Sequence, residues 1–232
     1  MAALYQQLEE ELRNKIISDE WKAEMRVPSE LELCEEYDLS RSTVRKALDS
    51  LVSSGYLQRI QGKGTFVRSN MIEQKLSKFY SFSEEFRKRG MKELAVLHDF
   101  RIVEADEEVA GNLNINEGER VYEITRTRLV NDMVYALETS YIPVSFSEDI
   151  TAEMISNNGL YRTMGLFHFC PDRAVEQLTA VAAGERIASY LKVDPDTPCM
   201  RIERIAYNSD RPVEFCESYT KGDMFSYTVE LR

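Results

Sequence analysis

Basic side chains gather in residues 40–67, SRSTVRKALDSLVSSGYLQRIQGKGTFV, of a chain whose formal net charge is −11. The segment holds Arg41, Arg45, Lys46, Arg59 and Lys63 against one acid, Asp49, and Arg68 follows it. Guanidinium and ammonium groups at this density bind phosphates, and arginine also reads base edges. Because binding depends on local charge, the acidic total does not exclude a nucleic-acid surface here.

A second pair of arginines suits a small anion. Arg126 and Arg128 stand two residues apart in a β-rich run, so both side chains project from the same face of a strand. In YSFSEEF, Ser81 or Ser83 caps a new helix whose free amides offer a further anion contact. The alternative interpretation is an exposed sheet face on which the two arginines are solvated.

Glutamates accompany these arginines. Glu138 and Glu217 are predicted to occupy equivalent positions of an internal repeat, where paired acceptors suit the hydroxyl or amino groups of a ligand. The alternative is that they pair with Arg204 and Arg126 within the sheet.

The sequence contains few residues that could bind a metal ion or act as a catalytic nucleophile. The cysteines are Cys34, Cys170, Cys199 and Cys216, without CxxC spacing, and the histidines are His98 and His168, isolated from one another. We therefore expect reduced, mostly buried thiols, no metal and no cofactor. No nucleophile is paired with a histidine and no glycine loop suits a phosphate, so we expect no enzyme.

Three helices must position the basic segment. Leu4, Leu8, Leu12 and Ile16 recur at helical spacing, and this helix should end near residues 18–21. Ser29 with Glu32 forms a capping box for a short helix that runs to about Tyr37. Ser40 caps a third helix that Gly55 ends.

The third helix is amphipathic. One stripe carries Val44, Ala47, Leu48, Leu51 and Val52, and the opposite face carries the basic residues of its first two turns. Two short strands follow, YLQRI and TFV, around a QGKG tip that brings Lys63 within reach of a duplex. This order is typical of a recognition helix and a β-wing.

Residues 5–68, with PSELELCEEYDLSRSTVRKALDSLVSSGYLQRIQGKGTFV, resemble the winged helix-turn-helix of GntR-type bacterial transcription regulators. The resemblance implies that Gln61 and Gly62 approach the minor groove and that the helix reads the major groove. The candidate DNA contacts are Ser40, Arg41, Ser42, Thr43, Arg45, Lys46, Gln61, Gly62 and Lys63. Leu31 stands where such proteins usually carry a DNA-contacting arginine, so operator discrimination should differ.

A repeat fills the second half of the chain, after a polar linker at residues 69–76. Ala110, Leu113, Ile124 and Arg126 match Ala188, Leu191, Ile202 and Arg204 at one constant spacing. Beyond the next turn we expect one extra residue in the second copy, so that Glu138 matches Glu217. Each copy reads strand, short helix, long strand, tight turn, long strand, with turns at Asn131-Asp132 and Ser209-Asp210. Two copies predict one antiparallel sheet with a ligand cleft near a pseudo-twofold axis.

Residues 76–232 resemble the UTRA effector-binding domain of the HutC subfamily, through SFSEEFRKRG, EITRTRL, ALETSYIP, GLYRTM and CESYTKGDMF. That domain is similar in fold to chorismate lyase but in regulators binds small molecules, commonly phosphorylated sugars. The resemblance implies that the effector contacts are Ser81, Phe82, Ser83, Arg126, Arg128, Glu138, Tyr161, Glu217 and Tyr219. Gly159 and Met224 depart from the usual serine and arginine.

The sequence therefore predicts an α+β protein with a winged helix-turn-helix domain at 1–68, a linker at 69–76 and a chorismate-lyase-like domain with an internal repeat at 77–232. We expect a cytoplasmic homodimer that represses transcription at a palindromic operator under control of a sugar phosphate, without a membrane span. An organic acid or amino-acid-pathway effector stays open, as does a lyase-like enzyme. A DNA-architectural protein is disfavoured by the paired arginines.

Overall fold

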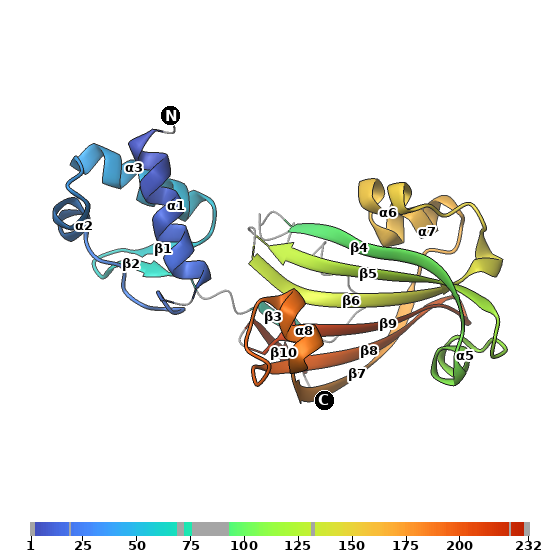
Figure 1. Cartoon of the computed structure of the whole chain (residues 1–232). Coiled ribbons are helices and arrows are strands. Elements are labelled where there is room, and N and C mark those ends of the chain that lie inside the picture. The colour runs from blue at the N-terminus through green and yellow to red at the C-terminus, as the bar shows by residue number, and fades with distance from the viewer. Residues whose placement is uncertain are drawn as a thin grey trace. The chain divides into compact units, whose positions relative to one another are not determined.

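The computed structural model describes residues 3–18, 20–68, 72–75, 93–130, 133–222 and 224–229 of the 232-residue chain, with the backbone alone for 72–75. The chain divides into two compact units, Met1–Asn70 and Met71–Arg232. Figure 1 shows a helical first unit and a second unit built on one broad sheet. The predicted α+β class is confirmed.

The described part of the first unit contains α1 (Leu4–Ile17), α2 (Glu30–Tyr37), α3 (Arg41–Ser53), β1 (Leu57–Ile60) and β2 (Gly64–Val67). All three predicted helices and both wing strands are present. The apolar stripe of α3 is buried except for the half-buried Val52, and α3 packs against α1, where the side chains of Leu8, Leu12 and Ile16 are also buried. Burial of these stripes fixes which side of α3 faces outward.

Capping explains where the helices begin. The Ser29 hydroxyl accepts from the Glu32 amide at 3.3 Å, and the Glu32 carboxylate accepts from the Ser29 amide at 2.7 Å. Ser40 caps α3 by accepting from the Thr43 amide at 3.3 Å. Both caps are the predicted ones, and they satisfy amides that a helix end leaves unpaired.

A six-stranded antiparallel sheet forms the centre of the second unit. Its order is β4 (Glu93–Glu104), β5 (Arg120–Val130), β6 (Met133–Pro143), β9 (Arg211–Lys221), β8 (Pro198–Asn208) and β7 (Arg173–Ala182). The order is symmetric about the contact between β6 and β9, so the predicted repeat and single sheet are confirmed. The turn at Ser209-Asp210 is confirmed, whereas Asn131-Asp132 lies outside the described residues.

The expected extra residue in the second copy is wrong. Both long hairpins carry a register shift, and the residue skipped by the pairing is Tyr135 in the first and Val213 in the second. These two residues keep the same spacing in sequence as Arg126 and Arg204. Cross-strand pairing therefore makes Cys216 the equivalent of Glu138, because Glu138 lies opposite Arg126 and Cys216 lies opposite Arg204.

The sheet has two distinct faces. Arg126, Glu138 and Ser218 lie directly opposite one another across three strands, and we call the face they share the Arg126 face. Thr139 lies opposite Glu217 on the other side, which we call the Glu217 face. Neighbouring residues of a strand point to opposite faces, so a shift of one residue moves a side chain through the sheet.

Each face is covered by its own helices (Figure 1). Helices α6 (Ala152–Asn158) and α7 (Leu160–Leu166) pack with Tyr122, Ile124 and Ile142 on the Arg126 face, near the short 3-10 helix Val144–Phe146. Helices α5 (Glu107–Leu113) and α8 (Gly184–Leu191) pack on the Glu217 face.

Two short strands complete the unit. β3 (Ile72–Lys75) pairs in parallel with β10 (Phe225–Thr228). Met224 and Phe225 pack against Ala136 and Ile202, which belong to the Arg126 face. Part of the predicted linker at 69–76 is thus a strand that pairs with the end of the chain.

Candidate functional site

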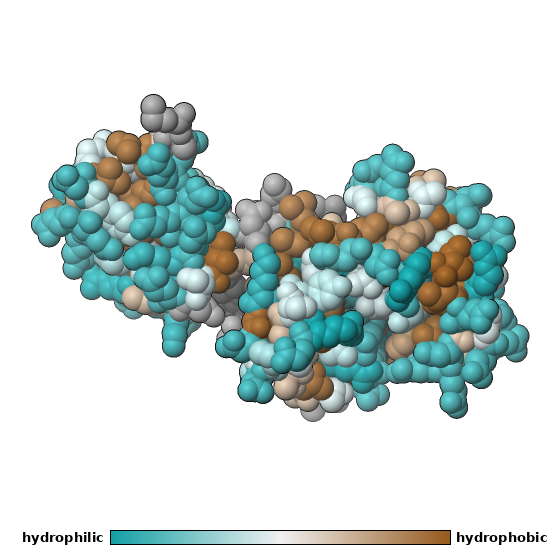
Figure 2. Space-filling view, in the orientation of Figure 1, coloured by the Kyte–Doolittle hydropathy of each residue, from teal (hydrophilic) through white to brown (hydrophobic). Residues whose placement is uncertain are grey.

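The exposed start of α3 is the first candidate surface. Arg41, Ser42, Arg45 and Lys46 are exposed, and Thr43 is half-buried. The Ser40 hydroxyl lies 3.0 Å from that of Ser42 and 2.8 Å from that of Thr43 as well as capping the helix. The structure therefore brings these six predicted residues together, and their contacts with DNA stay a prediction. In the space-filling view the exposed side chains of this unit are mostly hydrophilic (Figure 2).

Two of the basic side chains have partners within the unit. The Arg45 guanidinium donates to the Glu30 carboxylate, with Nη2 2.7 Å from Oε2 and Nε 3.1 Å from Oε1. The Lys46 ammonium lies 3.9 Å from the centroid of the Tyr5 ring, a cation–π contact. These contacts orient side chains that would otherwise sample many rotamers.

The wing tip is the second part of this surface. Gln61, Gly62 and Lys63 are exposed in the turn between β1 and β2, where the Lys63 amide donates to the Ile60 carbonyl at 3.0 Å. Gly64 has φ +123°, and a Cβ there would lie 3.2 Å from Arg26 Nε. Only glycine adopts this backbone readily, which explains the QGKG tip.

A band of buried charge crosses the Arg126 face and is the second candidate site. Along β5, Arg126 and Arg128 lie between Ile124, which packs with α6 and α7, and Val130, which packs with β10. Arg126 is 5% exposed and Arg128 is 8% exposed. Charges this deeply buried require partners, so the simple picture of solvated arginines does not apply.

Glu138 is the shared partner of the two arginines. Its carboxylate accepts from Arg126 Nη2 at 3.0 Å and from Arg128 Nη1 at 3.1 Å. Arg128 also donates to Glu93, through Nε at 2.6 Å and through Nη2. The alternative interpretation, in which Glu138 pairs with an arginine of the sheet, is therefore present, and two arginines share this carboxylate.

Opposite charges keep the side chains of Glu138 and Arg128 ionised. Burial alone would raise the pKa of Glu138, but the charges of Arg128 and Arg126 outweigh burial and leave the pKa below its ordinary value. Burial would likewise lower the pKa of Arg128, and the charge of Glu138 raises it instead. Glu138 and Arg128 therefore each hold the other in its charged form.

Arg204 extends the band toward α7. It lies opposite Cys216 and hence on the Arg126 face, where Nε donates to Glu176 at 2.6 Å and Nη1 donates to the Tyr161 hydroxyl at 3.3 Å. Burial raises the pKa of Tyr161, and nearby Glu214 adds to this effect. The structure thus brings Tyr161 to the face that carries Arg126, Arg128 and Glu138, as predicted.

Among the charged side chains of the band, two carry a buried atom without a hydrogen bond to the described residues. These atoms are Arg126 Nε and Glu214 Oε2, and the Glu214 side chain is only 2% exposed. Glu214 lies opposite Ala206, and alternation along β9 puts it on the face of Cys216 and Ser218. Buried polar atoms are rarely left unpaired, so this donor and this acceptor are available to a ligand or to water.

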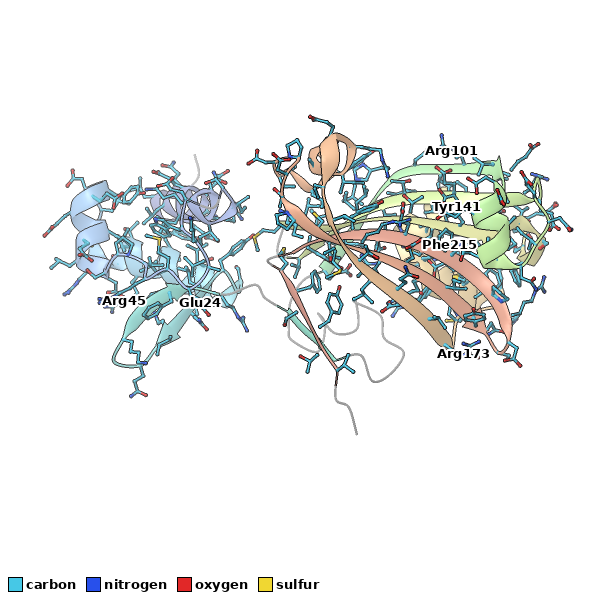
Figure 3. All side chains as sticks on the ribbon, turned by 90° about the horizontal axis from the view of Figure 1, so that it is seen from below. Glu24, Arg45, Arg101, Tyr141, Arg173 and Phe215 are labelled. Atoms are coloured by element: carbon cyan, nitrogen blue, oxygen red, sulfur yellow. The ribbon has the colours of Figure 1, made fainter. Side chains whose placement is uncertain are left out.

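Glu217 and Tyr219 lie on the other face, which corrects their predicted grouping with Arg126. Glu217 accepts from Arg201 Nε at 2.6 Å and from the Tyr219 hydroxyl at 3.1 Å. Their separation from Arg126 follows from the corrected register, because Phe215, Glu217 and Tyr219, which follow the bulge at Val213, lie on the face that α5 and α8 cover. Tyr141 and Phe215 lie opposite one another on this face, and their stacked rings have centroids 6.0 Å apart. Both residues are labelled in Figure 3.

Glu214 was missed because the predicted repeat carried one residue too many. One sequence signal could have identified it. If the spacing between the two copies is kept constant through the turn, Glu214, Cys216 and Ser218 alternate onto the face that carries Arg126 and Glu138. Ser81, Phe82 and Ser83 lie outside the described residues.

Comparison with known proteins decides the family. A family model described as "UTRA domain" matches residues 88–226, and one described as "Bacterial regulatory proteins, gntR family" matches residues 4–67. The chain is a gntR-family regulator with a UTRA domain. The predicted family is confirmed, and such regulators bind operator DNA and small-molecule effectors.

The matches to similar proteins extend along nearly the whole length of this chain. The regulator is 33% identical to the HTH-type transcriptional repressor NagR of Bacillus subtilis, over 97% of this chain and 93% of that protein. It is 30% identical to the probable fructoselysine utilization operon transcriptional repressor of Escherichia coli K12, over 98% and 94%. The crystal structure of PhnF from Mycobacterium smegmatis matches with a TM-score of 0.65 and 25% identity, over 97% and 98% of the two chains.

The described residues contain neither a metal-binding cluster nor a membrane-spanning helix. No group of three or more histidine, cysteine, aspartate or glutamate side chains there could hold a metal ion. Among the same residues no helix is long and apolar enough to cross a membrane.

Proposed function

We propose that this regulator is a repressor that binds a palindromic operator as a homodimer and changes its DNA affinity when a sugar phosphate occupies the Arg126 face. The single observation that carries the effector assignment is the pair of unpartnered buried atoms, Arg126 Nε and Glu214 Oε2. One is a donor that suits an anion, and the other is an acceptor that suits a hydroxyl or amino group.

Charge balance on the Arg126 face supports an effector of mixed character. Three guanidinium groups there, Arg126, Arg128 and Arg204, face four carboxylates, Glu93, Glu138, Glu176 and Glu214. A bare dianion would meet these carboxylates as well as the arginines. A phosphate on a polyhydroxylated body offers acceptors to the arginines and donors to the glutamates.

The named relatives favour a sugar-derived effector. The E. coli relative is described as a repressor of a fructoselysine utilization operon, and fructoselysine is a sugar derivative. This supports a sugar-derived compound for the present regulator and does not by itself select the phosphorylated form. The arginines of the Arg126 face are the reason to test the phosphorylated form first.

Calorimetric titration of hexose phosphates and amino-sugar phosphates into the full chain tests the proposal. Glu214→Gln should weaken binding about 10- to 150-fold, because it replaces a charged acceptor by a neutral amide. Glu217→Gln is the matched control, since it makes the same change on the opposite face and should bind as the wild type does. Equal weakening by both variants, or by neither, contradicts the assignment to the Arg126 face.

Two further measurements separate the remaining alternatives. The unphosphorylated sugars, run in parallel, should bind more weakly than their phosphates if Arg126 contacts the phosphoryl group. Ligand recovered after incubation should be chemically unchanged for an effector, whereas conversion to a product would favour a lyase-like enzyme.

A further inference from the structure

Glu30 is an acid in the middle of the basic DNA-reading surface. It is the first residue of α2, behind the Ser29 cap, and its carboxylate reaches across to α3. Oε2 accepts from both Arg45 Nη2 at 2.7 Å and Arg45 Nε at 3.2 Å, and Oε1 lies 3.1 Å from the same Nε. The carboxylate therefore covers one edge of the guanidinium.

The other edge of Arg45 is left for DNA. Among the described residues Nη1 has no hydrogen bond, and the side chain of Arg45 is 59% exposed. Arginine reads guanine with two parallel hydrogen bonds to O6 and N7, which require the guanidinium plane at a fixed orientation. A carboxylate on the Nε edge fixes that plane and leaves the Nη1 end available.

The same carboxylate is linked to the wing. Arg59 of β1 has Nη2 2.7 Å from Asp49 Oδ1 of α3 and 3.9 Å from Glu30 Oε1. A chain of charges, Arg45–Glu30–Arg59–Asp49, thus joins α2, α3 and the wing. It also gives Asp49, the one acid of the basic segment, a defined partner.

We infer that Glu30 is a positioning residue for operator recognition, which orients Arg45 toward a guanine and ties this orientation to the wing. Glu30 itself does not contact a base in this inference. Its negative charge also repels phosphates, so it should raise the ratio of operator affinity to non-specific affinity in two ways.

Glu30→Gln in the full-length protein tests the inference. The DNA probe is an operator selected from random duplexes by the wild-type protein, and the reference is a scrambled duplex of the same length. We expect the specificity ratio to fall about 10-fold, within the range for loss of one oriented base contact. Non-specific affinity should stay equal or rise. The melting temperature should hardly change, because this is an exposed ion pair.

Glu35→Gln is the matched control. Glu35 lies on the exposed side of the same helix, its substitution changes the net charge equally, and it has no arginine partner among the described residues. Its specificity ratio should equal that of the wild type. If Glu30→Gln and Glu35→Gln change operator and non-specific affinity by the same factor, Glu30 acts only through general charge and the inference is wrong.

Two readouts distinguish positioning from a structural role. In an Arg45→Ala background, Glu30→Gln should cause no further loss of specificity, because its target is gone. Replacing one operator guanine by 7-deazaguanine, which lacks the N7 acceptor, should weaken wild-type binding about 3- to 10-fold and should hardly affect Glu30→Gln. Additive losses in the double variant, or equal sensitivity of both proteins to every 7-deazaguanine, would overturn the inference.

Discussion

At the scale of single residues, Glu138 has the most demanding environment, because it is 6% exposed and its one carboxylate pairs with two buried guanidinium groups. The pair is no proof of added stability, since desolvation of the ions opposes their attraction. Removal of the Glu138 charge alone, in contrast, is expected to be strongly destabilising. Arg126 would stay buried without its carboxylate partner and Arg128 would keep only Glu93, and such a loss costs far more than the intact cluster contributes.

Glu138→Gln should lower the free energy of unfolding of the second unit by about 3–5 kcal/mol. In the wild type the pKa of Glu138 is lowered from 4.5 by the arginines, so its contribution is complete above about pH 4.5. That contribution disappears as the pH falls through the lower pKa of the folded state. The variant should be less stable at neutral pH and should lose less additional stability on acidification.

Urea denaturation between pH 3 and pH 7 measures both effects, with Glu217→Gln as the control. Glu217 has a side chain 22% exposed, and its pairing with Arg201 is expected to contribute about 0–1 kcal/mol. A Glu138→Gln curve parallel to that of the wild type over this pH range would contradict the assigned role of the carboxylate.

At the scale of helices and strands, residue spacing and helix caps predicted the elements correctly, whereas the sequence did not predict which side chains share a face of the sheet. The α1 stripe, the Ser29 and Ser40 caps and the repeated strand order depend on residues close in sequence, so local patterns predicted them. The grouping of Glu217 with Glu138 depended on register across a bulge. One misplaced residue at such a bulge reverses every side chain beyond it.

The sequence also could not predict which charged side chains are buried or which partners they contact. Two arginines at alternating positions are compatible with a solvated face, an anion site or a buried ion cluster, and only the cross-strand position of Glu138 separates these cases. Likewise, the link between Glu30 and Arg45 joins residues of different helices, and it depends on how α2 packs on α3.

The wing provides a prediction at this scale. Gly64→Ala should destabilise the β1–β2 hairpin by about 1–3 kcal/mol, since φ +123° is strained for any residue with a Cβ and the methyl would lie 3.2 Å from Arg26 Nε. Amide hydrogen exchange of residues 57–67 should therefore become faster, and operator affinity should fall with it.

Gly111→Ala is the contrasting substitution. Gly111 lies within α5, its Cβ would meet open space, and its φ is not positive. The same chemical change there should stabilise the second unit by about 0.5–1 kcal/mol. Destabilisation at both positions would mean that backbone conformation does not explain the effect in the wing.

At the scale of the whole molecule, the two units carry different chemistry. The first presents basic side chains around α3 and the wing, and the second encloses a band of mixed charge between two apolar clusters. Regulation requires that occupation of the second site change the DNA affinity of the first. A ligand does this only if it has different affinities for two arrangements of the protein.

Coupling of this kind is reciprocal, which gives the last prediction. If a sugar phosphate changes operator affinity by a factor of about 5 to 150, operator DNA must change sugar-phosphate affinity by the same factor. Titration of the ligand into the free protein and into its complex with a palindromic duplex measures that factor. The complex should contain two chains per duplex, as two symmetric half-sites require. Equal ligand affinities in the two titrations would show that the sites are uncoupled, even if each binds its own partner.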